Sequence, residues 1–276
     1  MGYLAPKTLD DALALLKTPD IRLVAGGTDI FPAQGDRLPD GDLLDVTRIA
    51  EMRGIAEREQ SLRIGAAVTW TEIAQASLPP AFLALKEAAL EIGSLQIQNA
   101  ATIGGNLCHA SPAADGVPPL LILNADVVLA SPKGIRRLPI QDFTTGPGTT
   151  ALRQGEILIA VNIPRPPAHA RSRSKKLGSR RYLVISIAMV AMMLRLDASG
   201  DIDVARVAVG ACSPKARRLK GLELDLLGSR PGDRLVEARH LAELAPISDV
   251  RGTADYRLEA VAEQIRRLMI ELTLDE

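Results

Sequence analysis

Residues 99–115 read NAATIGGNLCHASPAAD, a stretch with two adjacent glycines and almost no bulky side chains. A second glycine pair lies earlier in the chain, within LVAGGTDI at residues 23–30. Glycine adopts backbone conformations that other residues avoid, and successive N–H groups in such a turn can converge on an anion. Because no Cβ atom intervenes, a phosphate oxygen can approach this backbone to hydrogen-bonding distance. We therefore expect two backbone cradles that hold one diphosphate from both sides.

Each glycine pair also has a simpler interpretation as an ordinary turn after a strand, and either pair alone is a weak signal. Neither pair fits G-x-G-x-x-G or G-x-x-x-x-G-K-[ST], so the usual nicotinamide-dinucleotide and P-loop motifs are absent. Thr28 follows the first pair, and Thr102 and Asn106 flank the second. Their hydroxyl and amide groups would add hydrogen bonds to those of the backbone.

The composition excludes several classes of function. The chain has 276 residues, 47% of them hydrophobic and 24% charged, which is typical of a globular protein with one large or two medium domains. Basic and acidic residues balance at 33 each, so no basic excess points to nucleic acid or to an anionic membrane. Aromatic residues make up only 3% and leave little for stacking on bases.

Cysteine usage points to a reducing compartment. Only Cys108 and Cys212 are present, which excludes a disulfide framework and a cysteine-rich iron–sulfur or zinc site within this chain. No apolar run approaches the ~20 residues of a membrane-spanning helix, and the N-terminus lacks the pattern of a signal peptide. We expect a cytoplasmic protein with no membrane span and no nucleic-acid partner.

Local patterns predict an α+β chain. Thr8 with Asp11, and Thr69 with Glu72, are capping-box patterns that open helices. The segments ADVVLAS and IRRLPI (125–131 and 135–140) predict a hairpin, whereas VPPLLILNA (117–125) fits either a helix or a buried strand. The stretch around the second glycine pair is expected to be a loop. We expect further helices at 8–17, 69–76 and 79–93, and strands at 21–25, 42–49, 61–68 and 156–164.

A Pro-rich segment, PRPPAHARSRS at 164–174, is the best candidate for a domain boundary. Its basic continuation, RSRSKK at 171–176, is interpreted as a solvated loop. Beyond it, two apolar segments flank ASGD (198–201) and predict a strand–turn–strand unit. The final segment predicts a helix with an apolar stripe of core or subunit-interface residues: Leu258, Val261, Ile265, Leu268 and Leu272.

The combination of VAGGTDI and NAATIGGNLCHASPAAD, in that order and spacing, resembles the two FAD-binding loops of the flavoprotein subunits of molybdenum hydroxylases. This family includes the medium subunit of carbon monoxide dehydrogenase and the FAD domain of xanthine dehydrogenase. The resemblance extends over nearly the whole chain, including VAVGACSPKARRL (207–219) and SDVRGTADYR (248–257). It implies an α+β fold. Residues 1–166 would form an FAD-binding domain of the vanillyl-alcohol-oxidase (PCMH) type with two α+β subdomains. Residues 172–276 would form a small α+β domain like the carbon monoxide dehydrogenase flavoprotein C-terminal domain.

The resemblance also implies a set of FAD-binding residues. The first loop would wrap the diphosphate and adjoining groups, and the second would clasp it, with Ile103 near the flavin ring. Asp115 would accept from a hydroxyl or amide, and Lys176 would stabilise negative charge. The full set is Leu23, Val24, Ala25, Gly26, Gly27, Thr28, Asp29, Ile30, Ile92, Thr102, Ile103, Gly104, Gly105, Asn106, Asp115, Leu158 and Lys176. No residue is expected to be catalytic or to bind a metal, and Cys108–His109 would pack beside the flavin.

By the same resemblance, the chain is the FAD subunit of a larger complex. Its expected partners are an iron–sulfur small subunit and a molybdenum-binding large subunit, assembled as a dimer of heterotrimers. The molybdenum cofactor and the 2Fe–2S clusters would lie only in those partners. FAD would receive their electrons and pass them to NAD, a quinone or oxygen. The chain lacks the extra cysteines of the branch that resembles 4-hydroxybenzoyl-CoA reductase, which argues against that branch.

Two alternatives remain open. One is a free-standing FAD-dependent oxidoreductase of the same fold, for which no separate substrate domain is evident. The other is a non-enzymatic scaffold whose glycine pairs are only turns.

Overall fold

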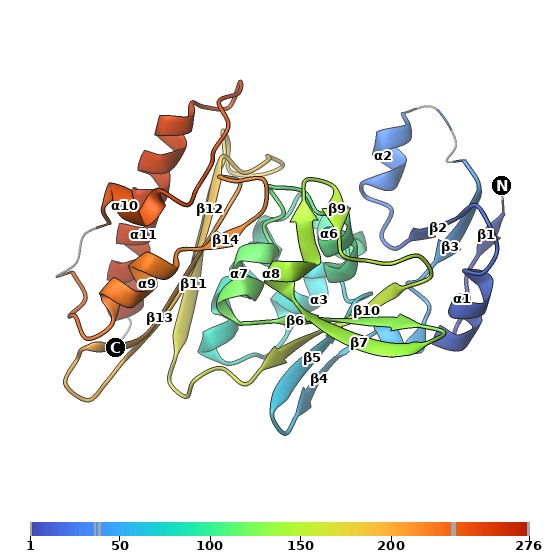
Figure 1. The fold of residues 1–276 in the computed structure, drawn as a ribbon, viewed down its shortest axis with the longest axis horizontal. Helices are drawn as coiled ribbons and strands as arrows, with labels where there is room; N and C mark the ends of the chain where they lie inside the picture. Colours follow the sequence, from blue (N-terminus) through green and yellow to red (C-terminus); the bar gives the residue numbers. More distant parts are fainter. Residues whose placement is uncertain (1, 36, 38–39, 233–235, 275–276) are drawn as a thin grey trace.

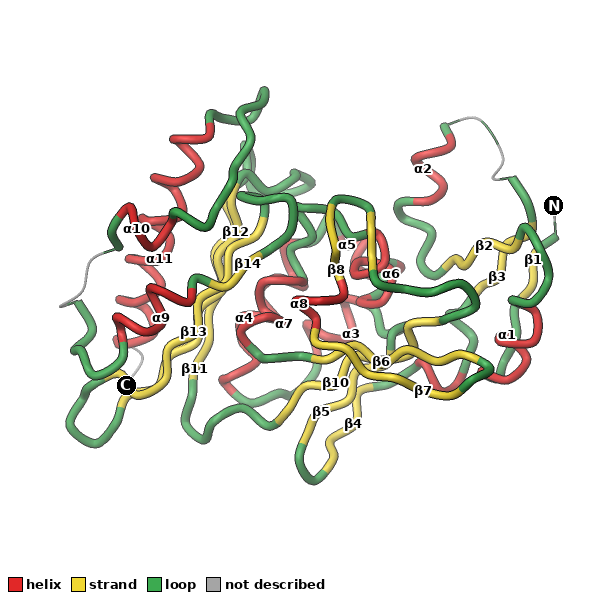
Figure 2. The backbone as a smooth tube through the Cα atoms, in the orientation of Figure 1, coloured by secondary structure: helices red, strands yellow, loops and turns green. Residues whose placement is uncertain are grey.

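The computed structural model describes residues 2–35, 37, 40–232 and 236–274. Figure 1 shows the three larger β-sheets spaced along the long axis of the molecule, with the N-terminal sheet at one end and helix α11 at the other. The same three groups of strands are visible in Figure 2. Within the described part of the chain, no helix is both long enough and apolar enough to cross a bilayer.

The first sheet is small and parallel. Its strands are β1 (Tyr3–Leu4), β2 (Ile21–Val24) and β3 (Asp42–Asp45), in the order β1-β3-β2. Helix α1 (Leu9–Leu15) begins after Thr8, whose side chain accepts the Asp11 N–H as predicted. The chain leaves β2 at the buried Val24, passes through the first glycine pair and enters α2 (Ile30–Gln34).

The second sheet is antiparallel and has five strands, in the order β4-β5-β10-β6-β7. Their bounds are β4 (Ile55–Arg58), β5 (Ser61–Gly65), β10 (Ile157–Pro164), β6 (Asp126–Ser131) and β7 (Gly134–Pro139). The predicted hairpin is therefore confirmed as β6–β7. A separate two-stranded antiparallel sheet, formed by β8 (Thr144–Gly146) and β9 (Thr149–Thr150), follows α8 (Ile140–Phe143).

Short helices accompany this sheet. The capping box of Thr69 and Glu72 is present and opens α3 (Trp70–Gln75). The segment 117–125, for which the sequence allows a helix or a strand, is helical over Val117–Ile122, with both prolines in the first turn. The elements are η1 (Ala50–Met52), α3 (Trp70–Gln75), η2 (Pro80–Phe82), α4 (Leu83–Glu91), α5 (Leu95–Ala100), α6 (Ile103–His109) and α7 (Val117–Ile122).

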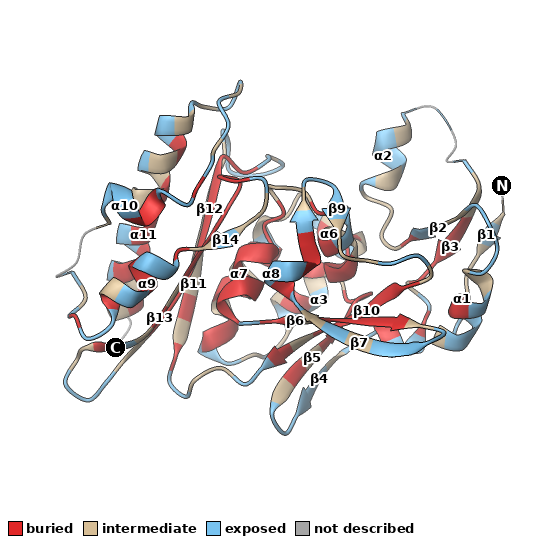
Figure 3. Ribbon diagram, viewed as in Figure 1, coloured by how far each residue is buried: buried red, intermediate tan, exposed pale blue. Residues whose placement is uncertain are grey.

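The C-terminal half is a four-stranded antiparallel sheet covered by helices. Its strands are β11 (Arg171–Leu177), β12 (Ala188–Leu196), β13 (Ile202–Gly210) and β14 (Arg217–Arg218), and its helices are α9 (Lys220–Leu226), α10 (Ala238–Leu241) and α11 (Ala254–Leu274). The predicted stripe of α11 packs into the core of this half. On the other face, Ala191, Met193 and Ala208 join the core of the first half. Burial on both faces explains why β12 is almost continuously apolar (Figure 3).

Two segments expected to be loops are regular structure. RSRSKK belongs to β11, so its interpretation as a solvated loop was wrong. Glu87 of α4 accepts the Ser174 N–H at 2.7 Å and pairs with Arg173 at 3.0 Å, and α4 packs against β11. The residues around the second glycine pair form α6, which is capped by Thr102. The partners of β11 are distant in the sequence, because the strand pairs with β12 and contacts Glu87 of α4. Helix α6 combines the local cap by Thr102 with N–H bonds to the distant Val68 and Ala66 carbonyls.

Candidate functional site

A cavity of about 800 Å³ lies between the first glycine loop, α6 and the loop from β11 to β12. The two glycine-containing segments meet here. The position of a Cβ on Gly26 would lie 2.0 Å from the Ala100 carbonyl oxygen, and His109 Nε2 lies 3.8 Å from Asp29 Oδ1. Segments that lie far apart in the sequence therefore form one cavity wall.

The first loop offers backbone donors to this cavity. Within the described residues, the N–H groups of Gly26, Gly27, Thr28 and Asp29 have no hydrogen-bond acceptor. Gly27 has φ +70°, a conformation that L side chains rarely adopt. Unpaired N–H groups on consecutive residues can converge on an anion, which is the role that the sequence predicts for this loop.

The second segment is built differently from the expected cradle. All N–H groups of its first turn are taken by protein acceptors at 2.9–3.0 Å: Ile103 by Val68, Gly104 by Ala66, Gly105 by the Thr102 hydroxyl and Asn106 by the Thr102 carbonyl. The expectation that successive N–H groups of Gly104 and Gly105 converge on an anion was therefore wrong. What this segment offers instead is side chains. Asn106 Oδ1 and Trp70 Nε1 are buried beside the cavity, and neither has a partner in the described part of the protein.

Glycine is needed here mainly for close packing of backbone. A Cβ on Gly104 would lie 2.7 Å from the Ala66 carbonyl oxygen, so this residue faces the core and not the cavity. Gly105 does line the cavity, and its added Cβ would find only the Thr102 hydroxyl at 3.1 Å and the Ala25 Cβ at 3.9 Å. The second pair thus has one glycine for packing and one that keeps the cavity open.

A buried polar cluster, the interdomain latch, closes one edge of the cavity. Lys176 Nζ lies 2.8 Å from Asp115 Oδ2, and both side chains are only 7% exposed. The Ser186 hydroxyl donates to Asp115 Oδ1 at 2.5 Å, and Lys176 also donates to the Glu91 carbonyl at 3.0 Å. Asp115 and Glu91 belong to the first half of the chain, whereas Lys176 and Ser186 belong to the second. The latch therefore holds the two halves together with an ion pair of zero net charge.

The position of Glu91 beside the latch makes ionisation of its carboxyl less favourable. Burial raises the pKa of its carboxyl above the ordinary value, and the nearby Lys176 ammonium offsets part of this effect. An acid with a raised pKa keeps its proton longer in the folded than in the unfolded state. The folded state consequently loses stability as pH rises from the unfolded-state pKa, about 4.3, through the folded-state value.

We expect Glu91→Gln to be more stabilising at pH 8 than at pH 4, because glutamine cannot ionise and escapes this penalty. Denaturant unfolding at the two pH values measures the difference, with Glu259→Gln on the exposed face of α11 as the control for removing a charge. An effect of Glu91→Gln that is equal at both pH values, or larger at pH 4, would contradict the burial argument.

Most residues expected from the sequence line this one cavity: Leu23 to Ile30, Ile92, Thr102, Gly105, Asn106, Asp115 and Lys176. Ile103, Gly104 and Leu158 do not line it; Ile103 and Leu158 are buried in the hydrophobic core. Sequence reasoning missed Trp70, Ile97 and the run from Leu183 to Ile185 as lining residues. Trp70 is the only tryptophan of the chain, but nothing in its sequence neighbourhood connects it to either glycine pair. Cys108 and His109 also line the cavity, and no group of metal-ligating side chains occurs among the described residues.

Comparison with known proteins assigns the chain to a family. Residues 1–166 match the FAD binding domain in molybdopterin dehydrogenase. Residues 173–272 match the CO dehydrogenase flavoprotein C-terminal domain. The chain belongs to the FAD-binding subunits of the molybdenum hydroxylases. It is therefore an oxidoreductase subunit that binds FAD, and the fold expected from the sequence is confirmed.

Relatives of this FAD-binding subunit match over nearly their whole length. The xanthine dehydrogenase FAD-binding subunit of Escherichia coli O157:H7 is 35% identical over 280 residues, covering 98% of this chain and 95% of that protein. The carbon monoxide dehydrogenase medium chain of Hydrogenophaga pseudoflava is 30% identical over 274 residues, covering 97% and 95%. A chain in the structure of reconstituted CO dehydrogenase from Oligotropha carboxidovorans superposes with a TM-score of 0.90 at 28% identity, covering 100% of this chain and 98% of that one.

The residues present fit FAD in three respects. The unpaired N–H groups of the first loop suit a diphosphate, because each can donate to a phosphate oxygen. The buried Asn106 Oδ1 and Trp70 Nε1 supply an acceptor and a donor that lack protein partners. The volume of about 800 Å³ lies within the range of about 300–1,000 Å³ that is typical of cofactor sites.

Proposed function

We propose that the cavity between the first glycine loop and the interdomain latch holds FAD, and that this subunit relays electrons from an iron–sulfur partner to an external acceptor. When bound, FAD supplies the redox chemistry, since it accepts single electrons and releases two together. The observation that supports the proposal most is the run of unpaired backbone donors from Gly26 to Asp29, all of which line one cavity. The chain's own task is to bind and orient the cofactor.

We assign the following roles to the residues. The backbone from Gly26 to Asp29 donates to the diphosphate, and the Thr28 hydroxyl adds a further donor. Asn106 accepts from a cofactor donor that no protein group satisfies. The latch fixes the Lys176 ammonium and the Asp115 carboxylate at the edge of the cavity. The remaining lining contacts come from Leu23, Val24, Ala25, Ile30, Ile92, Thr102 and Gly105, and the packing of Ile103, Gly104 and Leu158 shapes the wall behind them.

The partners follow from the family. Relatives are named as FAD-binding subunits or medium chains, which denotes components of larger complexes. We therefore propose an iron–sulfur small subunit and a molybdenum-binding large subunit, in a cytoplasmic dimer of heterotrimers. NAD, a quinone or oxygen would be the acceptor. The alternative is a free-standing FAD-dependent oxidoreductase.

Purification of the chain from its own host separates these alternatives. We expect a yellow protein with about one extractable FAD per chain, and co-purifying polypeptides that carry iron–sulfur clusters and molybdenum. Reoxidation assays with NAD⁺, quinone and oxygen would then identify the acceptor. A yellow protein that turns over alone would support the alternative, and a colourless one would contradict FAD binding.

A substitution of one cavity residue tests the role of the side chains. We expect Asn106→Asp to weaken FAD binding at least about tenfold, or about 1.4 kcal/mol, because a carboxylate in the cavity repels the diphosphate. Quenching of flavin fluorescence on titration measures the affinity. Asn162→Asp on β10, outside the cavity, controls for a new charge on the same residue type. Equal affinities of the two variants would argue against contact between Asn106 and the cofactor.

A further inference from the structure

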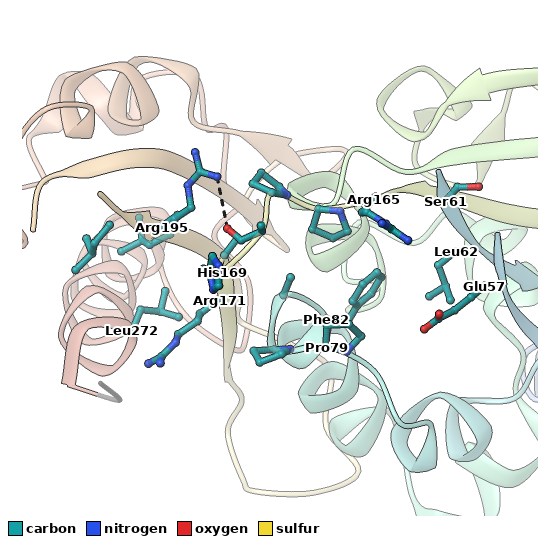
Figure 4. A pocket seen from close by; sticks show the side chains of 18 of the residues that line it. Glu57, Ser61, Leu62, Pro79, Phe82, Arg165, His169, Arg171, Arg195 and Leu272 are labelled. Carbon is teal, nitrogen blue, oxygen red and sulfur yellow. Dashed lines mark hydrogen bonds between the residues drawn. The ribbon is translucent and has the colours of Figure 1, made fainter. Parts of the chain in front are cut away.

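A second cavity, the junction cavity, lies where the two halves of the chain meet (Figure 4). It has a volume of about 630 Å³ and shares no lining residue with the FAD cavity. Its walls come from the β4–β5 hairpin, η2, the Pro-rich connection at 165–170, the ends of β11 and β12, and the end of α11. Domain junctions are preferred places for small-molecule sites, and this volume lies within their usual range.

The floor of the junction cavity is apolar and well packed. Leu62, Phe82, Leu194 and Leu272 line it, and each is at most 5% exposed. The buried Ser172 fixes the neighbouring backbone, because its hydroxyl donates to the Ala81 carbonyl at 2.7 Å and accepts the Ala84 N–H at 3.0 Å. The apolar wall therefore does not depend on a ligand for its shape.

Positive charge surrounds this floor. Arg195 forms a bidentate ion pair with Asp203, in which Nε donates to Oδ1 and Nη2 donates to Oδ2, each at 2.8 Å. Arg58 and Arg165 also line the cavity, and within the described residues their side chains have no ion-pair or hydrogen-bond partner. The Arg165 N–H donates to the Gln60 carbonyl at 3.0 Å, which ties the connection to the hairpin that carries Arg58. Figure 4 shows Arg165 on the same side of the cavity as Phe82, Leu62 and Ser61. Two exposed guanidinium groups without an ion-pair partner among the described residues thus line a cavity that has an apolar floor.

We propose that the junction cavity binds a small organic carboxylate with an aromatic or aliphatic body. The body would occupy the apolar floor, and the carboxylate would accept hydrogen bonds from Arg58 and Arg165, whose planar donors match its geometry. An inorganic anion would leave the apolar floor exposed to water. A polyanion would meet the Glu57 carboxylate on the same wall. This site goes beyond FAD binding and does not depend on it.

Binding of a carboxylate here tests the proposal directly. We would titrate 1-naphthoate into the FAD-loaded protein, in the assembly in which it purifies, and follow the heat by calorimetry. The expected result is saturable binding of about one molecule per chain, with no change in the flavin spectrum. Neutral 1-naphthamide and inorganic phosphate should each bind at least about tenfold more weakly. The amide lacks the negative charge that pairs with the arginines, and phosphate lacks an apolar body for the floor.

Single substitutions assign the site. We expect Arg58→Gln and Arg165→Gln each to weaken 1-naphthoate binding at least about tenfold. Arg137→Gln, on the exposed strand β7 and outside the cavity, should bind like the wild type. Wild-type affinity in both cavity variants, or equal binding of the neutral amide, would overturn the proposal. A third outcome would also overturn the proposal: the wild type binds no naphthoate, and Arg165→Gln releases a partner subunit. The face would then be a subunit interface.

Discussion

A Gly26→Ala variant is expected to lose FAD and to unfold more easily than the wild type, although it adds a single methyl group. The new Cβ would lie 2.0 Å from the Ala100 carbonyl oxygen and 2.9 Å from the Ala101 Cα, and backbone atoms cannot rotate out of the way. The loop must then move away from the segment that precedes α6, which separates the two walls of the cavity. Overpacking of this kind costs about 1–3 kcal/mol, and more where the backbone has to shift.

A matched glycine controls for the change of residue type. Gly221 lies in α9, and an added Cβ there would find no atom within 4 Å. Gly221→Ala should therefore keep its FAD and be as stable as the wild type or slightly more stable. Flavin absorbance after gel filtration and denaturant unfolding measure both quantities. If Gly26→Ala retained FAD fully and at wild-type affinity, this would contradict the claim that the two glycine segments together form one wall of the cavity.

A Lys176→Met variant is expected to lose about 3–5 kcal/mol of unfolding free energy, because it leaves the Asp115 carboxylate buried without its cation. The Ser186 hydroxyl would remain as its only side-chain donor from the latch. FAD retention should fall with stability, since the latch forms one edge of the cavity and joins the two halves. Asp115→Asn is expected to be costly for the converse reason, an unpaired buried ammonium.

The double variant Asp115→Asn/Lys176→Met makes this prediction specific. It should recover most of the stability that each single variant loses, because neither buried charge then remains. An exposed pair on α11, Glu263 with Arg266, supplies the control cycle, in which little coupling is expected. Additive losses at Asp115 and Lys176 would show that the two charges do not depend on each other.

Local rules predicted the elements whose ends are determined locally. Thr8 and the Thr69–Glu72 box mark helix starts because their side chains satisfy N–H groups within three residues. RSRSKK carries no such local determinant. It becomes a strand because residues 171–177 pair along their length with β12 in an antiparallel ladder, and Glu87 of α4 also accepts the Ser174 N–H and pairs with Arg173. Helix α6 has a local cap in Thr102, but its first two N–H groups donate to the distant Val68 and Ala66 carbonyls, which a glycine pair in the sequence does not reveal.

In the candidate site, too, features determined locally were predicted from the sequence, and features that depend on distant residues were not. The first loop is contiguous, and its interpretation as a set of backbone donors agrees with the structure. The second segment was assigned the same role by its glycines, whereas the structure shows its donors already paired. Trp70 and the run from Leu183 to Ile185 reach the cavity only through tertiary packing. The closeness of Asp115 and Lys176 also arises from the docking of the two halves.

The structure of the FAD complex is the most direct test of the central claim. We expect the diphosphate oxygens to lie about 3 Å from the N–H groups between Gly26 and Asp29, with the cofactor in contact with Asn106 and the edge formed by the latch. FAD found outside this cavity, or held there with the Gly26–Asp29 donors still unpaired, would contradict the account.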